Sequence, residues 1–494
     1  MQTLPPEVLS EIFLNCIVTK AITLPSRAPI LLTRVNRLWR AVALSTPRLW
    51  SCLYLVRYAR RLQDCSQFLG HMPSNDGTKA RTYVTALRTW LSLSKRTPLT
   101  LHFTVHEIAS TAQAEDLLAE YMRILCTHSA RWKDVEIRIP YNFRNFIPIL
   151  NQCRSLPFLE SFYFDDWEAS WEPIDITILE SAPLLRRVRI THPFLESWFL
   201  PWSQLTRLSI ESCTSWDTDY ANPFDMDLFI DILSHCINLE VLKFLCDFPY
   251  CPSVTRSTST FAVLPQLQCL RMEIIVGSAE YDTDEAEITL TFLLQCLTHL
   301  VLPKLRTLEL PRDLNHHNWD DSFLQFLTHF SESLENLKIV YCSIPLHVFT
   351  NMLELLPNLT SMDISFAATS ARDWEGILGG LTLTSTAYGR KSLVPNLVKL
   401  EIFWSDNGKS AFYEAFTTMI ESRWQARSRR VLEIVEGADT PSGLTTLCVG
   451  SVENTMEQMA PSQRARLAKC VEEGLCLVGR WKMPYRNSMF DPAW

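Results

Sequence analysis

Apolar residues recur along most of the chain in one phrase, a proline or polar residue followed by Leu-x-x-Leu-x-Ile or a close variant. The phrase appears nine times between residues 156 and 402. Alternation of apolar and polar positions inside each phrase predicts a short β-strand. The first apolar anchors, which follow one another at steps of 20 to 38 residues, are Leu159, Leu185, Leu205, Leu239, Leu267, Leu305, Leu334, Leu359 and Leu397.

Helical stretches separate these phrases, for example residues 224–236 and 412–424, where apolar residues recur at helical spacing. A strand and a helix repeating every 20–30 residues with Leu-x-x-Leu-x-Leu are typical of leucine-rich repeats. In such a repeat the Leu and Ile side chains point inward and stack on the neighbouring units. We therefore predict an α/β repeat fold, an irregular leucine-rich repeat solenoid (horseshoe) over residues 99–479, followed by an extended tail at 480–494.

A (β/α)₈ barrel is the main alternative, because its strand–helix unit is also about 30 residues long. Barrel strands are buried on both sides and read as nearly continuous apolar runs. Here a charged residue alternates with the anchors in nearly every strand, as in Arg187-Val188-Arg189. One face of the sheet must therefore be exposed to solvent, which favours the solenoid.

The alternating polar positions of the strands predict where a protein target would bind. They point to the face of the solenoid opposite the helices, where charge is tolerated and aromatic side chains act as interface anchors. The residues predicted to bind a target are Arg187, Arg189, Lys243, Arg271, Glu309 and Trp404.

The first residues of the chain follow a different pattern. The run from Leu4 to Ile17 reads LPPEVLSEIFLNCI, in which Pro6 is suited to the first turn of a helix and Glu7 complements the helix dipole. A second apolar stripe, from Ile30 to Val42, is interleaved with arginines and ends before Pro47. The spacing predicts a small helical bundle.

Three blocks in this segment, LPPEVLSEIF, VNRLWRAVA and TPRLWSCLYL, resemble the F-box, particularly the variant abundant in fungal F-box proteins. The resemblance covers residues 1–55 and implies docking on a Skp-type adaptor that links to a cullin–RING ubiquitin ligase. We expect residues 56–98 to form a helical linker to the repeats. Carried over by position, the implied adaptor-facing residues are Leu4, Pro5, Glu7, Leu9, Ile12, Phe13, Leu31, Val35, Trp39, Leu49 and Trp50.

Charge separates the two parts of the chain. Residues 1–63 carry nine Lys and Arg against two Glu, a balance of +7, whereas the whole chain has a net charge of −8. An acidic body argues against nucleic-acid or membrane-surface binding. Fifteen cysteines without a Cys-x-x-Cys pair, and a start without a signal-peptide pattern, predict reduced thiols and a cytoplasmic or nuclear protein.

Candidate chemistry is sparse. Asp165 and Asp166, with Glu168, could act as paired carboxylates, but a solvated turn after a strand is the simpler interpretation. His316 and His317 suggest metal ligands, yet adjacent histidines diverge on most backbones. No hydrolase, nucleotide-binding or metalloprotease motif is present. We therefore expect no enzymatic activity, no cofactor and no metal.

The combined prediction is a substrate-recognition subunit of a Skp–cullin–F-box ubiquitin ligase, holding an unidentified protein target through its repeats. The resemblance supplies the ligase half of this prediction, and the periodicity supplies only a large binding surface. A leucine-rich repeat scaffold for protein–protein interaction, without a role in ubiquitination, is the alternative.

Overall fold

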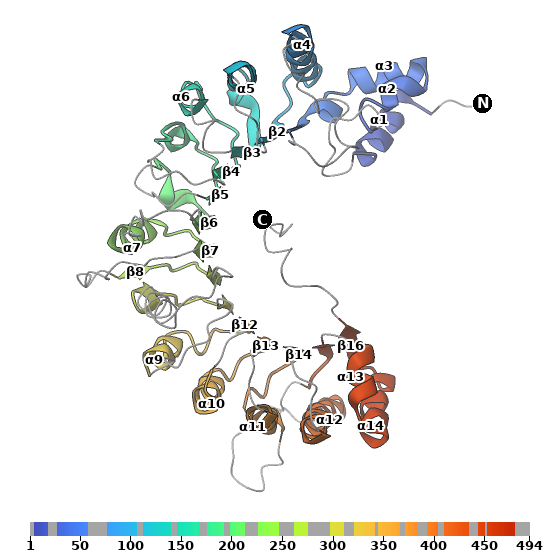
Figure 1. Cartoon of the computed structure of the whole chain (residues 1–494), viewed down its shortest axis with the longest axis vertical. Helices are drawn as coiled ribbons and strands as arrows, with labels where there is room; N and C mark the ends of the chain where they lie inside the picture. The colour runs from blue at the N-terminus through green and yellow to red at the C-terminus, as the bar shows by residue number, and fades with distance from the viewer. Residues whose placement is uncertain are drawn as a thin grey trace. The chain divides into compact units, whose positions relative to one another are not determined.

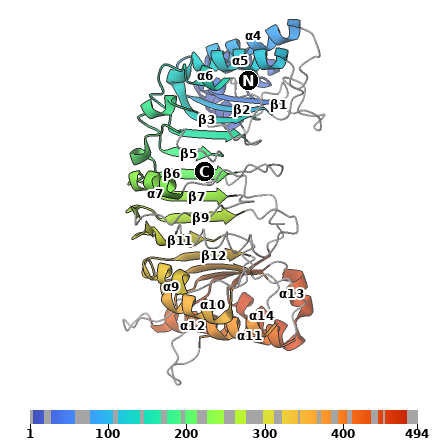
Figure 2. The same cartoon turned by 60° about the vertical axis from the view of Figure 1, so that its left-hand side comes forward.

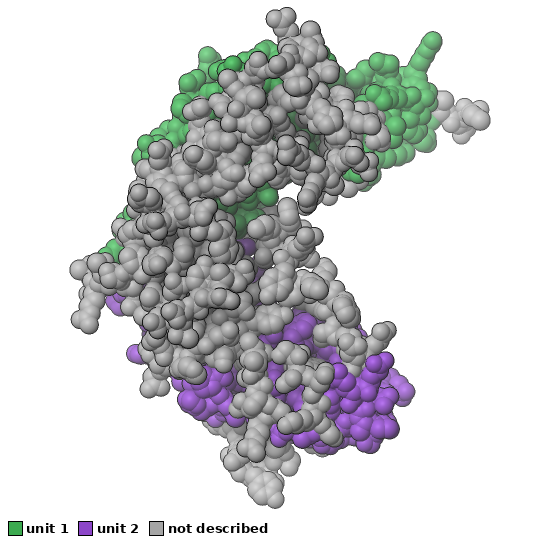
Figure 3. All heavy atoms as spheres, viewed as in Figure 1, with its two compact units in different colours: residues 1–239 green, residues 240–494 purple. Residues whose placement is uncertain are grey.

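The computed structural model describes residues 4–17, 27–57, 77–105, 112–139, 146–166, 175–191, 198–212, 226–246, 261–274, 297–310, 321–340, 344–365, 371–383, 393–403, 410–433, 443–449 and 452–479. The chain divides into two compact units, residues 1–239 and 240–494 (Figure 3). None of the described helices is long and apolar enough to cross a membrane.

The first unit begins with a small helical module and continues as strands that alternate with helices. The module contains α1 (Pro6–Asn15), α2 (Leu32–Val35), α3 (Arg37–Ser45) and the 3₁₀ helix η1 (Pro47–Trp50). The strands are β1 (Cys52–Arg57), β2 (Leu99–Val105), β3 (Trp132–Ile139), β4 (Ser161–Asp166), β5 (Arg187–Ile190) and β6 (Arg207–Ser212). Between and after them lie α4 (Gly77–Leu93), α5 (Ala112–Cys126), η2 (Ser129–Arg131), α6 (Ile147–Leu150), η4 (Ile178–Ser181), η6 (Trp202–Gln204) and α7 (Met226–His235).

The second unit repeats the same alternation. Its main strands are β7 (Val241–Cys246), β9 (Cys269–Ile274), β11 (Thr307–Glu309), β12 (Asn336–Val340), β13 (Ser361–Ser365), β14 (Lys399–Phe403), β15 (Thr446–Val449) and β16 (Cys476–Gly479). Its helices are α9 (Asp321–Thr328), α10 (Leu346–Leu355), α11 (Ala371–Leu381), α12 (Ser410–Glu433), α13 (Val452–Gln458) and α14 (Pro461–Glu472). A separate pair, β8 (Ala262–Val263) and β10 (Leu300–Val301), completes it.

Within each unit the strands pair in parallel and in chain order, and the helices line one side of the sheet (Figures 1 and 2). All nine predicted leucine anchors are 0% exposed, so each repeat stacks its leucines on the next. These features confirm the leucine-rich repeat solenoid. The described strands of neither unit close on themselves, which removes the barrel alternative.

The sheet starts earlier than the sequence pattern predicts. Cys52–Arg57 forms β1, which pairs in parallel with β2, and α4 packs on α5 and on η1. The segment predicted as a helical linker, 56–98, therefore includes the end of a strand and the helix of the first repeat. The boundary at residue 99 is corrected for this reason. Pro47 and Arg48 precede β1 as a proline and a polar residue precede several later strands, but three residues instead of two separate Leu49 from Leu53, and the run was assigned to the helical module.

The helical module packs directly on this first repeat. Trp50 is buried, its indole Nε1 donates to the Ala43 carbonyl at 2.9 Å, and its ring meets Trp90 of α4 edge-on with centroids 4.9 Å apart. At the start of α3, Asn36 Oδ1 accepts a hydrogen bond from the Trp39 backbone N–H at 2.8 Å and so caps the helix. The module and the first repeat thus share a core.

Candidate functional site

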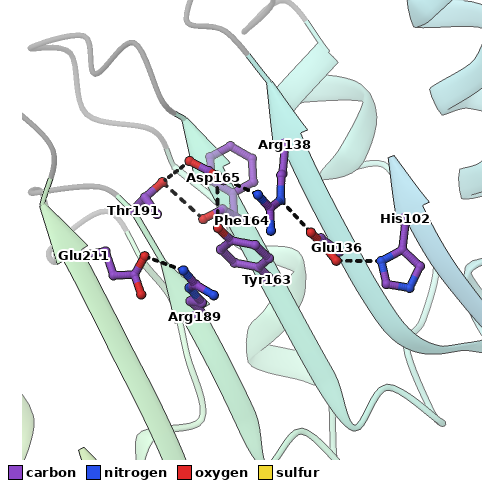
Figure 4. A network of polar contacts seen from close by, with 9 residues as sticks. All are labelled: His102, Glu136, Arg138, Tyr163, Phe164, Asp165, Arg189, Thr191 and Glu211. Atoms are coloured by element: carbon purple, nitrogen blue, oxygen red, sulfur yellow. Dashed lines mark hydrogen bonds and ion pairs between the residues drawn. The ribbon is translucent and has the colours of Figure 1, made fainter. Parts of the chain in front are cut away.

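Polar side chains occupy the face of the first unit's sheet opposite its helices. Because the strands pair in register, residues at equivalent positions form rows across the sheet. The central row consists of Tyr54, His102, Glu136, Tyr163, Arg189 and Ser209. Together with Arg138, Asp165, Thr191 and Glu211 from the ends of the same strands, these residues form what we call the polar face; Figure 4 shows its hydrogen-bonded core.

Glu136 is the acceptor on the β2–β3 side of the polar face. His102 Nδ1 lies 2.5 Å from Glu136 Oε2, and Arg138 Nε donates to Glu136 Oε1 at 2.5 Å (Figure 4). Burial alone would raise the pKa of Glu136, but the hydrogen bond from His102 and the charge of Arg138 outweigh it and lower that pKa to about 2. Tyr54 stacks flat on the His102 ring, with centroids 4.1 Å apart. Glu136 is therefore an ionised carboxylate that accepts two hydrogen bonds.

Tyr163 lies at the centre of the polar face between two arginines. The guanidinium carbons of Arg138 and Arg189 stand 4.8 and 4.4 Å from its ring centroid, close enough for cation–π attraction from both sides. Its hydroxyl donates to Asp165 Oδ2 at 2.9 Å. Burial, reinforced by the Asp165 charge, raises the pKa of Tyr163, so the phenol stays protonated and acts as a donor.

Asp165 does not lie in a solvated turn, so that sequence interpretation was wrong for this residue. Its side chain is only 14% exposed. Thr191 Oγ1 donates to Oδ1 at 3.0 Å, and Arg138 Nη1 lies 3.8 Å from Oδ2. Burial raises the pKa of Asp165, while the Arg138 charge and the two hydroxyl donors oppose that rise. Because both carboxylate oxygens accept hydrogen bonds, Asp165 is poorly placed to act as a base. The Asp166 side chain and Glu168 lie outside the described residues.

Arg189 and Glu211 form the β5–β6 side of the polar face. Arg189 Nη2 donates to Glu211 Oε2 at 2.7 Å, and Ser209 Oγ donates to Glu211 Oε1 at 3.1 Å. Burial acts to lower the pKa of Arg189, but the Glu211 carboxylate outweighs it and raises that pKa. Among the described residues, the buried Nε of Arg189 has no hydrogen-bond partner. Because this Nε is also inaccessible to solvent, the contacts of Arg189 with Glu211 and with the Tyr163 ring are what hold its side chain in place.

The residues predicted to bind a target divide between the two units. Arg187 and Arg189 belong to the first unit, and Arg187 Nη2 donates to Asp134 Oδ1 at 2.9 Å. Arg271, Glu309 and Lys243 belong to one row of the second unit, where Arg271 Nε lies 3.0 Å from Glu309 Oε1. Lys243 is only 4% exposed, so its prediction as a contact residue is corrected. Trp404 lies outside the described residues, as do His316 and His317.

The residues that the F-box resemblance implies divide between the surface and the core of the helical module. Leu4, Ile12, Leu31 and Val35 are 43–51% exposed, Pro5 and Glu7 are exposed, and Trp39 is half-buried. Four others are at most 5% exposed, and this burial removes them from any adaptor-facing surface: Leu9, Phe13, Leu49 and Trp50. Their role is internal, since the Phe13 ring packs against Trp39 with centroids 5.0 Å apart. Sequence reasoning missed three other exposed apolar side chains of the module, Val8, Leu38 and Leu44.

The sequence also did not predict the polar face as a set of interacting residues. The alternating residues of WKDVEIRI and SFYFDD were visible, but only the register shows that Glu136, Tyr163 and Arg189 stand side by side. No described group of three or more His, Cys, Asp or Glu side chains could hold a metal ion. The arrangement of paired charges around a fixed tyrosine favours an ordered recognition surface.

Comparison with known proteins finds distant structural similarity only. No protein-family model matches the sequence, and no curated protein matches it. A solved protein from Bacteroides fragilis is similar at a TM-score of 0.30 and 15% identity, covering 71% of this chain and 82% of that one. Toll, in its complex with Spätzle from Drosophila, is similar at a TM-score of 0.26 and 11% identity. That alignment covers 74% of this chain and 50% of the Toll chain.

The low pKa of Glu136 predicts an acid-dependent loss of stability. A carboxylate whose pKa is lowered from 4.5 to about 2 on folding stabilises the folded state above pH 4.5, and this contribution disappears as the pH falls towards 2. The shift corresponds to about 3 kcal/mol. Denaturant unfolding of Glu136→Gln should therefore show a free energy of unfolding well below that of wild type at pH 6, and the difference should shrink by pH 2.5.

The control Glu120→Gln removes exposed ion pairs with Arg88 and Arg123 and should change the free energy of unfolding little. A Glu136→Gln deficit that stays constant with pH would contradict the assignment.

Proposed function

We propose that this chain is the target-recognition subunit of a Skp–cullin–F-box type ubiquitin ligase. In this proposal the helical module binds a Skp-type adaptor, and the partly exposed residues of the polar face, such as His102, Glu136 and Arg138, bind a protein target. The chain performs no bond chemistry itself. It raises the effective concentration of the target at the ligase by holding both partners.

One observation carries the adaptor half of the proposal. The helical module already has a core, made by residues such as Leu9 and Phe13, and yet it leaves further large apolar side chains in water. These exposed residues are Leu4, Val8, Ile12, Leu31, Val35 and Leu38, each at least 39% exposed. Val8 and Ile12 are four residues apart on α1, as are Leu31 and Val35 at α2, so the members of each pair share a helix face. Exposed apolar side chains that gather on a small module are typical of a protein interface. Here they coincide with the blocks that resemble the F-box.

Charge and rigidity support the same proposal. The five arginines of the module, Arg27, Arg34, Arg37, Arg40 and Arg48, surround Leu31, Val35 and Leu38 in the sequence. Positive charge accelerates encounter with an acidic adaptor more than it tightens the complex. The Trp50–Trp90 contact fixes the module on the first repeat, so an adaptor bound to it would be held at a defined position relative to the polar face of the same unit.

The adaptor half is tested with exposed residues, because buried ones would confound docking with folding. Val8→Ser, Ile12→Ser and Val35→Ser together should leave the thermal unfolding curve nearly unchanged. Each removes about 1 kcal/mol of burial at the interface, so adaptor capture on co-expression should fall by at least about tenfold. The matched control is Val263→Ser with Val301→Ser, which changes two similarly exposed valines of the second unit.

Two outcomes would overturn the ligase role. Wild-type chain that captures no Skp-type adaptor would leave a leucine-rich repeat scaffold as the remaining function, because the polar face does not depend on the adaptor. A triple variant that captures the adaptor as well as wild type would show that docking uses another surface.

A further inference from the structure

One position of the repeat has a regular structural role. It immediately precedes the first leucine anchor, and in seven of the nine repeats it carries a polar side chain that bonds to a neighbouring repeat. Asn358 Nδ2, for example, donates to the Glu332 carbonyl at 2.8 Å. The other bonds run from Gln204 to the Ala182 carbonyl, Asn238 to Ser203, Lys304 to the Gln266 side chain, Ser333 to Leu305 and Asn396 to Pro357. In six of the nine repeats, this position therefore bonds the repeat to the one before it.

Phe158 and Leu184 are the two exceptions. They are 51% and 43% exposed, so each places apolar surface in water where the other repeats form a hydrogen bond. They also lie in adjacent repeats: Ser161 of β4 pairs with Arg187 of β5, which brings the positions three residues earlier next to one another. Exposed apolar side chains add little to folding stability, because they bury little surface. Two such residues side by side indicate a contact surface.

Two arginines that form no ion pair with a described carboxylate flank these two residues. Arg154 precedes Phe158 by four residues, Arg186 follows Leu184 by two, and both are exposed. Arg186 donates to the Leu185 carbonyl at 3.2 Å, and neither arginine forms an ion pair with a described carboxylate. The neighbouring Glu160 is engaged by Lys133, whose Nζ lies 3.7 Å from Glu160 Oε2. A partner with a carboxylate would supply the missing charge.

We propose that Phe158, Leu184, Arg154 and Arg186 form a docking site for an acidic–apolar segment of a protein partner. The apolar side chains of the segment cover Phe158 and Leu184, and its carboxylates pair with the two arginines. The site is made by the turns that precede β4 and β5, whereas the polar face is made by the strands themselves. It is therefore a third binding surface, beyond the adaptor and target surfaces of the proposed function.

The variants that test this site follow from the repeat itself. Asparagine already occupies the same position in three other repeats, so Phe158→Asn with Leu184→Asn should fold normally. A second variant, Arg154→Glu with Arg186→Glu, keeps the apolar pair and reverses the charge. Ile237→Asn is the matched control, because Ile237 is 50% exposed in the same unit but stands at a different position of its repeat.

The probe is a random 12-residue phage-displayed peptide library, selected on the full-length wild-type chain and depleted on the double-asparagine variant. Selected peptides should combine Asp or Glu with Leu or Phe. Their affinity, measured by fluorescence anisotropy, should fall at least about tenfold in both double variants and stay unchanged in Ile237→Asn. Absence of peptides specific for wild type would overturn the proposal, as would selected peptides without acidic residues. A marked fall in the melting temperature of the double-asparagine variant would assign Phe158 and Leu184 a structural role instead.

Discussion

Trp50→Ala is expected to destabilise the first unit by about 3–5 kcal/mol, the usual cost of truncating a buried aromatic side chain to alanine. Trp50 is only 5% exposed and packs edge-on against Trp90 of α4. Its loss leaves a cavity where the helical module meets the first repeat, and leaves the Ala43 carbonyl without its indole donor. Hydrogen–deuterium exchange should therefore rise first in α1, α3 and β1.

Trp50→Phe is the matched control for this prediction. It keeps an aromatic ring in the Trp90 contact and removes the indole N–H together with part of the ring volume, so the expected cost is smaller, about 1–2 kcal/mol. A Trp50→Ala variant whose exchange and melting curve match those of wild type would show that the module is not coupled to the repeats. Deleting residues 1–55 is a poorer test of adaptor docking, because the deletion removes most of β1 and exposes the edge of β2.

The solenoid was predictable because leucine burial imposes its period on the sequence. Each anchor must reach the interior, so the spacing of Leu159, Leu185 and their equivalents reports the strands directly, and all of them are fully buried. β1 escaped detection because three residues instead of two separate Leu49 from Leu53, and because the run TPRLWSCLYL was assigned to the F-box-like module. A short run such as Cys52–Arg57 satisfies a helical pattern as well as a strand pattern when it is read alone.

The functional surfaces were less predictable, since they depend on direction and register. In the helical module, Leu9 and Phe13 repeat at helical spacing, and so do Val8 and Ile12. Both pairs are apolar, and only the packing of α1 on α3 decides that the first pair is internal and the second faces water. Lys243 shows the converse case, because an alternating polar position proved to be buried. Polar partners such as Glu136 and Arg138 could be assigned only once the strands were aligned.

Arg423 is a buried cation that holds together two segments of the second unit, the segment at the end of α11 (residues 381–383) and the turn before β14 (residues 393–394). It is 0% exposed, and its guanidinium donates to the carbonyls of Leu381, Val394 and Leu393 at 2.7, 3.1 and 2.9 Å. The neighbouring Ser422 Oγ accepts from the Leu383 backbone N–H at 3.0 Å. Burial lowers the pKa of Arg423 to about 10, so the group is still charged at neutral pH. The negative end of α11, which ends at Leu381, compensates part of that charge.

Arg423→Met should therefore cost about 3 kcal/mol or more, because it keeps most of the side-chain volume but leaves three carbonyls without their donor. Hydrogen–deuterium exchange should rise in the described parts of residues 371–403 before it rises in β7 or β9. Arg423→Lys should be intermediate, since a single ammonium group cannot reproduce the planar fork that reaches all three acceptors. The control Gln425→Met lies on the exposed side of the same helix and should change stability by less than about 0.5 kcal/mol. An Arg423→Met variant as stable as this control would mean that the three carbonyls find other donors. Arg423 would then not be what holds residues 381–383 and 393–394 against α12.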